Sequence, residues 1–369
     1  MDYNTGDEPI ITERKRHLKA LLILLMLVIV MAGLSSAYTM YQKNNQSPQP
    51  VTPVSEFTAT GLADNIPNGM LSGVILYRTV TFSGNDTTAY LGMYTVNTGQ
   101  VNLSSVKAVL AALPVTATTT LVLQNVATDA TKYQLGFLHQ NNDTVTPLDE
   151  VTAFGLNDLS VSNNNTMYAY SFQTIEATST EVDSVNNWSI AIHTNFSGDA
   201  IVITEAIHPQ WVDNSTAVIF MKTDGLYRID LLTNEIKEVA GLDDRTFTVF
   251  DGLAVSKDST KVLLTNAKGN QIEVLSLSGG GSVEVTVQSI GQITSPAVNY
   301  SNPLFSPDSQ YYSVVATRLS EPTMINGLLD FNNDSRIEIR YVTNADVMQS
   351  VKIDDETKSG ITLLKWLSR

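Results

Sequence analysis

Short apolar segments alternate with polar turns through most of the chain, and the clearest example is residues 207–239. Within it, residues 217–221 form an apolar run, and residues 227–231 alternate apolar and polar side chains. Polar turns separate these segments, at residues 213–215, 223–225 and 233–234. Alternation with a period of two, interrupted by Asn, Asp and Gly turns, is typical of short antiparallel strands. The pattern predicts a four-stranded sheet, too small to bury both of its faces alone.

The first turn of this unit recurs along the chain at similar intervals. An Asx-rich turn precedes an apolar run at Asn164, Asp213, Asp258 and Asp308, in steps of 49, 45 and 50 residues (164 to 213, 213 to 258, 258 to 308). A second turn recurs nearer the end of each unit, at residues 97–99, 233–235 and 343–346. A period of about 40–50 residues with four strands per repeat is the range of β-propellers.

These residues carry a family resemblance. The segment SPDSQYYSVVA (306–316) and the unit from PQW to GLYRIDLLTNE (209–235) resemble the repeats of TolB-type, WD-like (PD40-like) β-propellers. Those repeats pair a Ser-Pro-Asp-Gly turn with a later Thr-Gly-Glu-like turn, whereas here Ser or Asn replaces the Gly. The resemblance covers roughly residues 66–369. It implies a propeller fold and contacts with other proteins, and it brings no catalytic residues with it.

The expected fold is therefore all-β, a propeller of six four-stranded antiparallel blades over residues 70–369. Seven blades remain open if residues 107–149 are misread as one unit. The first unit, 73–106, supplies three strands, and one strand at 361–368 is left over at the end of the chain. We expect this last strand to enter the first blade and pair with residues 73–80, because an open ring would expose a strand edge.

A different pattern precedes the propeller. Residues 1–19 are polar and end in a basic cluster, and residues 20–40 carry no charge. At 1.5 Å per residue this uncharged span is roughly 30 Å long, the thickness of a bilayer core. We predict a cytoplasmic tail (1–19), a single transmembrane helix (20–41) and a Pro-containing linker (42–69), with the propeller outside the membrane. A signal cleaved near Ser35-Ser36-Ala37 is the alternative.

Composition narrows the range of functions. The formal net charge is −15, and residues 1–42 contribute four acidic and four basic side chains to it, so the acidic excess lies in the remainder. Such a surface repels phosphate backbones, and nucleic-acid binding is not expected. The chain has no cysteine, which excludes disulfides, thiolate catalysis and cysteine-ligated zinc.

One segment resembles a calcium-binding loop of the EF-hand or dockerin type. Oxygen-bearing side chains occupy its positions 1, 3, 5 and 9, namely Asp330, Asn332, Asp334 and Glu338. Position 6 is Ser335 instead of Gly, and position 12 is Tyr341 instead of a bidentate Glu. We predict a weak calcium site here; the alternative is the tip of an Asn- and Asp-rich hairpin.

No catalytic constellation accompanies the repeats. The histidines beyond residue 42, His139, His193 and His208, lack metal-ligand spacing, and motifs such as Gly-x-Ser-x-Gly are absent from the sequence. The acidic pairs at 243–244 and 354–355 are expected to be solvated turns. We therefore predict a non-enzymatic scaffold that binds an envelope protein or a wall polymer. The alternative is a cell-surface hydrolase or lyase acting on carbohydrate at the propeller centre.

Overall fold

The computed structural model describes residues 72–369 except for 84–85, 108, 117–118, 127–130, 140–141, 177–183, 197–198, 241, 243–244, 267–269, 279–284, 296–297, 319–322, 326–327, 331–333, 344–346, 353–360 and 368–369. All described residues belong to the unit Glu56–Arg369. The predicted cytoplasmic tail, transmembrane helix and linker lie outside them. Within the described part of the chain, no helix has the length and apolar character needed to cross a membrane.

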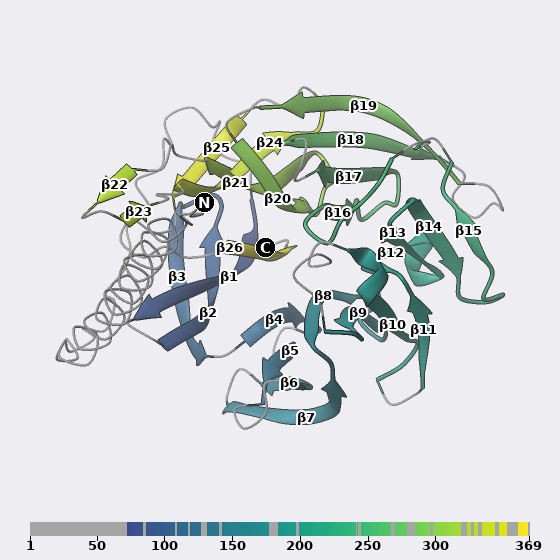
Figure 1. Ribbon diagram of the computed structural model, residues 1–369, viewed down its shortest axis with the longest axis horizontal. Helices are drawn as coiled ribbons and strands as arrows, with labels where there is room; N and C mark the ends of the chain where they lie inside the picture. The colour runs from purple at the N-terminus through teal and green to yellow at the C-terminus, as the bar shows by residue number, and fades with distance from the viewer. Residues whose placement is uncertain are drawn as a thin grey trace, which may run out of the picture. The chain divides into compact units, whose positions relative to one another are not determined.

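The described residues form six four-stranded antiparallel sheets, which follow one another around a ring as the blades of a propeller (Figure 1). From the inner to the outer strand, blade 1 is β26 (Ile361–Leu367), β1 (Val74–Ser83), β2 (Asp86–Thr95) and β3 (Gln100–Lys107); blade 2 is β4 (Val109–Pro114), β5 (Thr119–Asn125), β6 (Lys132–His139) and β7 (Asn142–Thr152); and blade 3 is β8 (Gly155–Val161), β9 (Tyr168–Gln173), β10 (Trp188–His193) and β11 (Ala200–Thr204).

The other three blades follow the same order. Blade 4 is β12 (Ile207–Val212), β13 (Ala217–Lys222), β14 (Gly225–Asp230) and β15 (Ile236–Glu238); blade 5 is β16 (Gly252–Val255), β17 (Lys261–Asn266), β18 (Gln271–Ser278) and β19 (Thr286–Thr294); and blade 6 is β20 (Val298–Phe305), β21 (Tyr311–Arg318), β24 (Asp334–Tyr341) and β25 (Val347–Lys352). The predicted count of six blades is confirmed, and the segment predicted as the second unit supplies one blade, β4 to β7.

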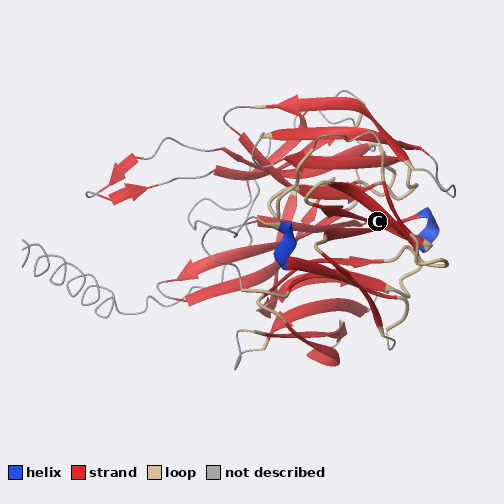
Figure 2. Cartoon of the chain, turned by 45° about the vertical axis from the view of Figure 1, so that its right-hand side comes forward, coloured by secondary structure: helices blue, strands red, loops and turns tan. Residues whose placement is uncertain are grey.

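Helix is confined in the described residues to two short 3-10 turns, η1 (Val185–Asn187) and η2 (Asp213–Ser215) (Figure 2). The segment between β21 and β24 is an insertion into blade 6. It contains a separate two-stranded sheet formed by β22 (Thr323–Ile325) and β23 (Leu328–Asp330). A hairpin can be inserted there because the two flanking strands remain neighbours within blade 6.

The C-terminal strand closes the ring, as predicted. β26 pairs antiparallel with β1, from Val74 opposite Leu367 to Thr79 opposite Ile361. Trp366 is buried, and its indole Nε1 donates a hydrogen bond to the carbonyl of Ser72 at 3.3 Å. β26 also contacts β20 of blade 6, so the two ends of the domain meet in one blade.

The apolar core lies between blades. In β13, the side chain of Val218 packs in a cluster with Ile190 of blade 3, while Ile219 packs in a cluster with Leu264 of blade 5. Successive residues of a strand point to opposite faces, and in a propeller both faces of a middle strand meet a neighbouring blade. This is why the run 217–221 is apolar throughout and does not alternate.

The turn between the first two strands has one shape in blades 3, 5 and 6. A Ser hydroxyl donates to the side-chain oxygen two residues later at 2.5–2.6 Å, in the pairs Ser162–Asn164, Ser256–Asp258 and Ser306–Asp308. The next residue adopts a left-handed backbone conformation, with φ of 55° at Asn165, 56° at Ser259 and 57° at Ser309. This is the position at which the TolB-type repeats carry Gly, the residue best suited to positive φ.

Ser259 and Ser215, which lies in the corresponding turn of blade 4, also join neighbouring blades. The Ser215 hydroxyl accepts a hydrogen bond from the backbone N–H of Asn163, and the Ser259 hydroxyl accepts one from the backbone N–H of Asp213, each at 2.9 Å. Glycine could not make these bonds. The replacement of Gly by Ser therefore has a structural reason: backbone strain at the turn is offset by a contact with the preceding blade.

Candidate functional site

The described residues of the predicted calcium site lie on two different sheets, the β22–β23 hairpin and blade 6. Asp330 ends β23 and Asp334 begins β24, whereas Asn332 lies outside the described residues. Glu338 lies four residues beyond Asp334, about 13 Å along an extended strand, and its Oε2 accepts hydrogen bonds from Nε and Nη2 of Arg340 at 3.0 and 2.6 Å. Among the described residues, no group of three or more His, Asp or Glu side chains could hold a metal ion. Calcium binding by this segment stays a prediction.

Three inner strands depart from regular pairing at similar places. The register shifts in β8, β12 and β20, and each shift contains a non-glycine residue with positive φ: Asp158 (54°), His208 (59°) and Asn302 (51°). Asp, Asn and His are the residue types that tolerate this conformation best after Gly. Such bulges re-aim a side chain out of the regular alternation.

Two of these side chains meet across the boundary between blades 3 and 4. Nδ1 of His208 lies 2.7 Å from Oδ2 of Asp158. The Ser171 hydroxyl donates to the same carboxylate oxygen at 3.2 Å, and its oxygen accepts from the backbone N–H of His208 at 3.0 Å. His208 and Ser171 are buried. The three residues form a buried polar link between β12 and the two inner strands of blade 3.

The charge of Asp158 controls the protonation of His208. Burial by itself would lower the pKa of the imidazole, but the neighbouring Asp158 carboxylate, through its charge and its hydrogen bond, outweighs burial and raises it above the ordinary value. The charge of Asp251, just before blade 5, acts in the same direction. Asp158 therefore favours the charged form of the His208 imidazole, which burial alone would disfavour.

This arrangement differs from a Ser-His-Asp catalytic triad. In a triad the histidine lies between the serine and the acid, so that its free nitrogen can take the serine proton. Here Asp158 lies between His208 and Ser171, and Ser171 is fully buried. A substrate cannot reach this hydroxyl, so the cluster fits a structural link between blades and not a nucleophile. His208, which has no metal-ligand spacing in the sequence, is buried on a bulge of β12.

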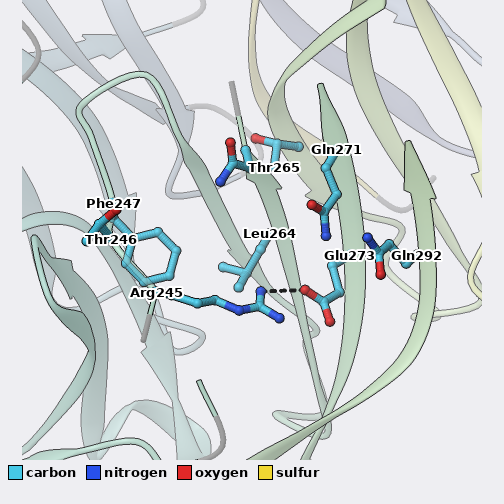
Figure 3. Close-up of a pocket in the computed structure, with 9 residues that line it drawn as sticks. Arg245, Thr246, Phe247, Leu264, Thr265, Gln271, Glu273 and Gln292 are labelled. Carbon is cyan, nitrogen blue, oxygen red and sulfur yellow. Dashed lines mark hydrogen bonds and ion pairs between the residues drawn. The ribbon is translucent and has the colours of Figure 1, made fainter. Parts of the chain in front are cut away.

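A cavity of about 380 Å³ lies where the linker after blade 4 crosses the face of blade 5 (Figure 3). The linker contributes Arg245, Thr246 and Phe247, and β17, β18 and β19 contribute Leu264, Thr265, Asn266, Gln271, Glu273 and Gln292. The backbone N–H of Phe247 donates to the carbonyl of Thr223 at 2.8 Å, which fixes the linker to the turn between β13 and β14.

One ion pair crosses this cavity. Nη1 of Arg245 donates to Oε2 of Glu273, as the dashed line in Figure 3 marks. The Glu273 side chain is 4% exposed and the Arg245 side chain is 37% exposed, so the carboxylate is buried and its cation reaches solvent. The cavity therefore contains a buried carboxylate, and the ion pair as a whole has no net charge.

Sequence reasoning missed this cavity. The available signal was Glu273 itself, an acidic residue between two apolar neighbours in a strand, where a buried charge requires a partner. The partner, Arg245, lies 28 residues earlier in a linker, and no local pattern connects the two.

The two remaining histidines of the described residues form no second site. His193 stacks on Tyr168 with ring centroids 4.3 Å apart, and His139 is exposed, with Nδ1 3.4 Å from the Thr119 hydroxyl. The acidic pair 354–355 and both members of 243–244 lie outside the described residues, as does the Gly-rich segment 279–281.

Comparisons with known proteins give only distant likenesses. No protein-family description matches the chain, and no characterised protein matches it in sequence. Among solved structures, a putative TolB from Agrobacterium tumefaciens is 11% identical with a TM-score of 0.46, over 81% of this chain and 100% of that one. The periplasmic gluconolactonase of Pseudomonas aeruginosa is 12% identical with a TM-score of 0.46, over 78% and 99%. An oligogalacturonate lyase in complex with manganese is 9% identical with a TM-score of 0.47, over 82% and 86%. Likenesses this distant assign neither a family nor a function.

Proposed function

We propose that the protein is a single-pass membrane protein that displays a six-bladed propeller outside the membrane and binds an envelope protein or a wall polymer. The uncharged span 20–40 after a basic cluster supports the anchor and its orientation. The propeller supplies a rigid body whose faces carry loops and clefts suited to binding. In this proposal the N-terminus is cytoplasmic and residues 70–369 are extracytoplasmic.

The observation that carries the choice of binding over catalysis is the neutralised Glu273. Hydrolysis of a glycosidic bond generally requires two carboxyl groups that flank the bond, about 5–9.5 Å apart. The cavity on blade 5 contains one carboxylate, and Arg245 already engages it. The Asp158–His208 pair is likewise engaged and buried. Among the described residues these two sites favour a binding module over the hydrolase or lyase alternative.

Photo-crosslinking of the full-length protein in intact cells tests the proposal. A photoreactive residue at Leu232 or Phe250, whose side chains are 85% and 55% exposed, should form adducts with an envelope protein or wall polymer that mass spectrometry identifies. The matched control places the same photoreactive residue at buried Phe220, where no intermolecular adduct is expected. Release of new reducing ends from wall glycans by the purified protein, without adducts, would favour the enzyme.

Topology has its own test. Protease added to intact cells, or to spheroplasts where a wall or outer membrane intervenes, should digest residues beyond Lys43 and spare the N-terminus. Recovery of a soluble mature protein that begins near Tyr38 would show that the N-terminal segment is a cleaved signal.

A further inference from the structure

The cavity on blade 5 presents an ordered set of polar side chains. Leu264, Glu273 and Gln292 lie opposite one another on β17, β18 and β19, so their side chains share one face of the sheet. Asn266 and Gln271 form the next row on that face, because they pair with each other two positions away. Strands about 4.8 Å apart therefore space these groups at regular intervals.

The chemistry of this set fits a ligand that both donates and accepts hydrogen bonds. A side-chain amide carries two N–H donors and a carbonyl acceptor, and three amides line the cavity with two threonines. Within the described residues, no hydrogen bond engages the side-chain amide of Gln271 or Gln292. Figure 3 shows both near Glu273, whose other side faces Arg245. A sugar hydroxyl is donor and acceptor at once, and pairs naturally with such groups.

The charges described in the cavity disfavour ionic ligands. Arg245 and Glu273 cancel, and no other described lining residue is charged. An anionic ligand would meet a cation already engaged by a carboxylate, in a chain whose formal net charge is −15. A cationic ligand would meet a carboxylate already paired with a guanidinium.

The apolar lining is equally informative. Its two large apolar side chains, Phe247 and Leu264, are 5% and 3% exposed, so they give a floor but no pocket for an apolar anchor. Peptide recognition usually depends on such buried anchors. The volume of about 380 Å³ lies at the lower end of the range for small-ligand sites, about 300–1,000 Å³, and suits a chain end more than a long segment.

We propose that this cavity binds the end of a neutral, hydroxyl-rich glycan, with Gln271 and Gln292 as its principal hydrogen-bonding side chains. The inference deepens the proposed function, since it names the class of polymer that one surface of the binding module takes. Arg245 and Glu273 add charged hydrogen-bonding groups without a net charge, and Leu264 closes the floor.

Binding of oligosaccharides to the purified full-length protein tests the inference. The protein is held in a detergent without a sugar headgroup, because alkyl glycosides would compete for the site. Saturation-transfer NMR and calorimetry use four probes: neutral tetramers of glucose and of N-acetylglucosamine, a tetramer of galacturonate, and a Gly-Ser peptide. We expect at least one neutral tetramer to bind with a Kd on the order of 10⁻⁴–10⁻³ M, and the anionic tetramer and the peptide not to bind.

Matched variants locate the site. Gln271→Ala and Gln292→Ala should each weaken binding of the neutral tetramer about fivefold, the effect of one lost hydrogen bond. Gln288→Ala is the control, because Gln288 is an exposed glutamine on the same strand as Gln292 and does not line the cavity. Unchanged melting temperatures establish that all three variants fold.

Three results would overturn the inference: no neutral tetramer binds, the galacturonate tetramer or the peptide binds instead, or the Gln271 and Gln292 variants bind as the wild type does. Adducts from Leu232 or Phe250 in cells, without sugar binding in vitro, would remove this inference and leave the proposed binding function standing. Absence of both would remove the two together.

Discussion

Two boundaries between neighbouring blades, the one where the ring closes and the one between blades 3 and 4, are stabilised by different kinds of interaction. Where blade 1 closes the ring, β26 pairs with β1 along a backbone ladder, and buried Ile361, Leu363 and Trp366 pack with apolar residues of blade 6. Between the inner strands of blades 3 and 4, the buried Asp158–His208 pair and Ser171 make the link. The first boundary depends on the closing strand, whereas the second combines the apolar cluster of Val218 and Ile190 with a buried pair of ionisable side chains.

Both boundaries contain a base whose pKa is shifted, in opposite directions. Burial lowers the pKa of Lys365 on β26, and the charge of Lys257 adds to this. The pKa of His208 is raised, because its carboxylate neighbours outweigh burial. Within the described residues, Lys365 has no acidic partner in its partly buried position, whereas His208 lies against the Asp158 carboxylate. The two boundaries should respond differently to deletion, to substitution and to pH.

The largest effect is expected from removing the closing strand. Deletion of residues 361–369 exposes the edge of β1 and the apolar face that Trp366 covers, so the whole domain should lose cooperativity and aggregate. Thermal unfolding followed by circular dichroism measures this. Leu232→Ala is the control, since that side chain is 85% exposed and should leave the melting temperature unchanged. For a domain of this size, 1 kcal/mol of stability shifts the melting temperature by about two to four degrees. A truncated protein that melts within about two degrees of the intact one would therefore contradict closure as a source of stability.

The next effect is expected at the link between blades 3 and 4. Asp158→Asn keeps the shape of the side chain and tolerates positive φ, but removes the charge that faces His208. We expect a loss of about 1.5–3 kcal/mol of unfolding free energy, the contribution of a hydrogen bond to a charged group. His208 limits the loss by releasing its proton, so its pKa, followed by NMR, should fall relative to the wild type, because Asp251 alone then opposes the effect of burial. An unchanged pKa in this variant would show that Asp158 does not raise it.

The two boundaries should change the free energy of unfolding in opposite directions as the pH rises. His208 has a raised pKa in the folded state, so its contribution is complete below about pH 6.5 and is lost as the pH rises through the folded value. Lys365 has a lowered pKa, so the folded state gains stability as the pH rises from that value toward about 10.5. Urea unfolding across this range should show His208→Asn removing the early loss and Lys365→Met removing the later gain. Identical pH profiles for the two variants and the wild type would contradict both assignments.

The repeat period and the closing strand could be predicted from the sequence because both depend on local signals. Turns near Asp213, Asp258 and Asp308 mark the blade spacing, and a strand left unpaired at the end of the chain has one open position to fill. The Asp158–His208 pair could not be predicted. It depends on two bulges in strands 50 residues apart, at Asp158 and His208. Each has a positive φ, which the alternation of apolar and polar residues does not predict. The cavity on blade 5 could not be predicted for a related reason, because Arg245, which pairs with Glu273 there, lies in a linker far from it in the sequence.

The smallest effect is expected at the turns that join successive blades, where strain and bonding oppose each other. Ser259 has a φ of 56° and accepts a hydrogen bond from the backbone N–H of Asp213 in blade 4. Ser259→Ala keeps the strained conformation and loses the bond, so it should cost about 1 kcal/mol. Ser259→Gly loses the same bond but removes a strain of about 1–2 kcal/mol per left-handed residue, which offsets the greater flexibility of Gly in the unfolded chain. The glycine variant should therefore be as stable as the wild type within about 0.5 kcal/mol, and the alanine variant less stable than both.

Urea unfolding of the three proteins at one pH decides the order. An alanine variant as stable as the wild type would show that the bond between blades contributes nothing, and a glycine variant less stable than alanine would show that positive φ carries no strain at this turn.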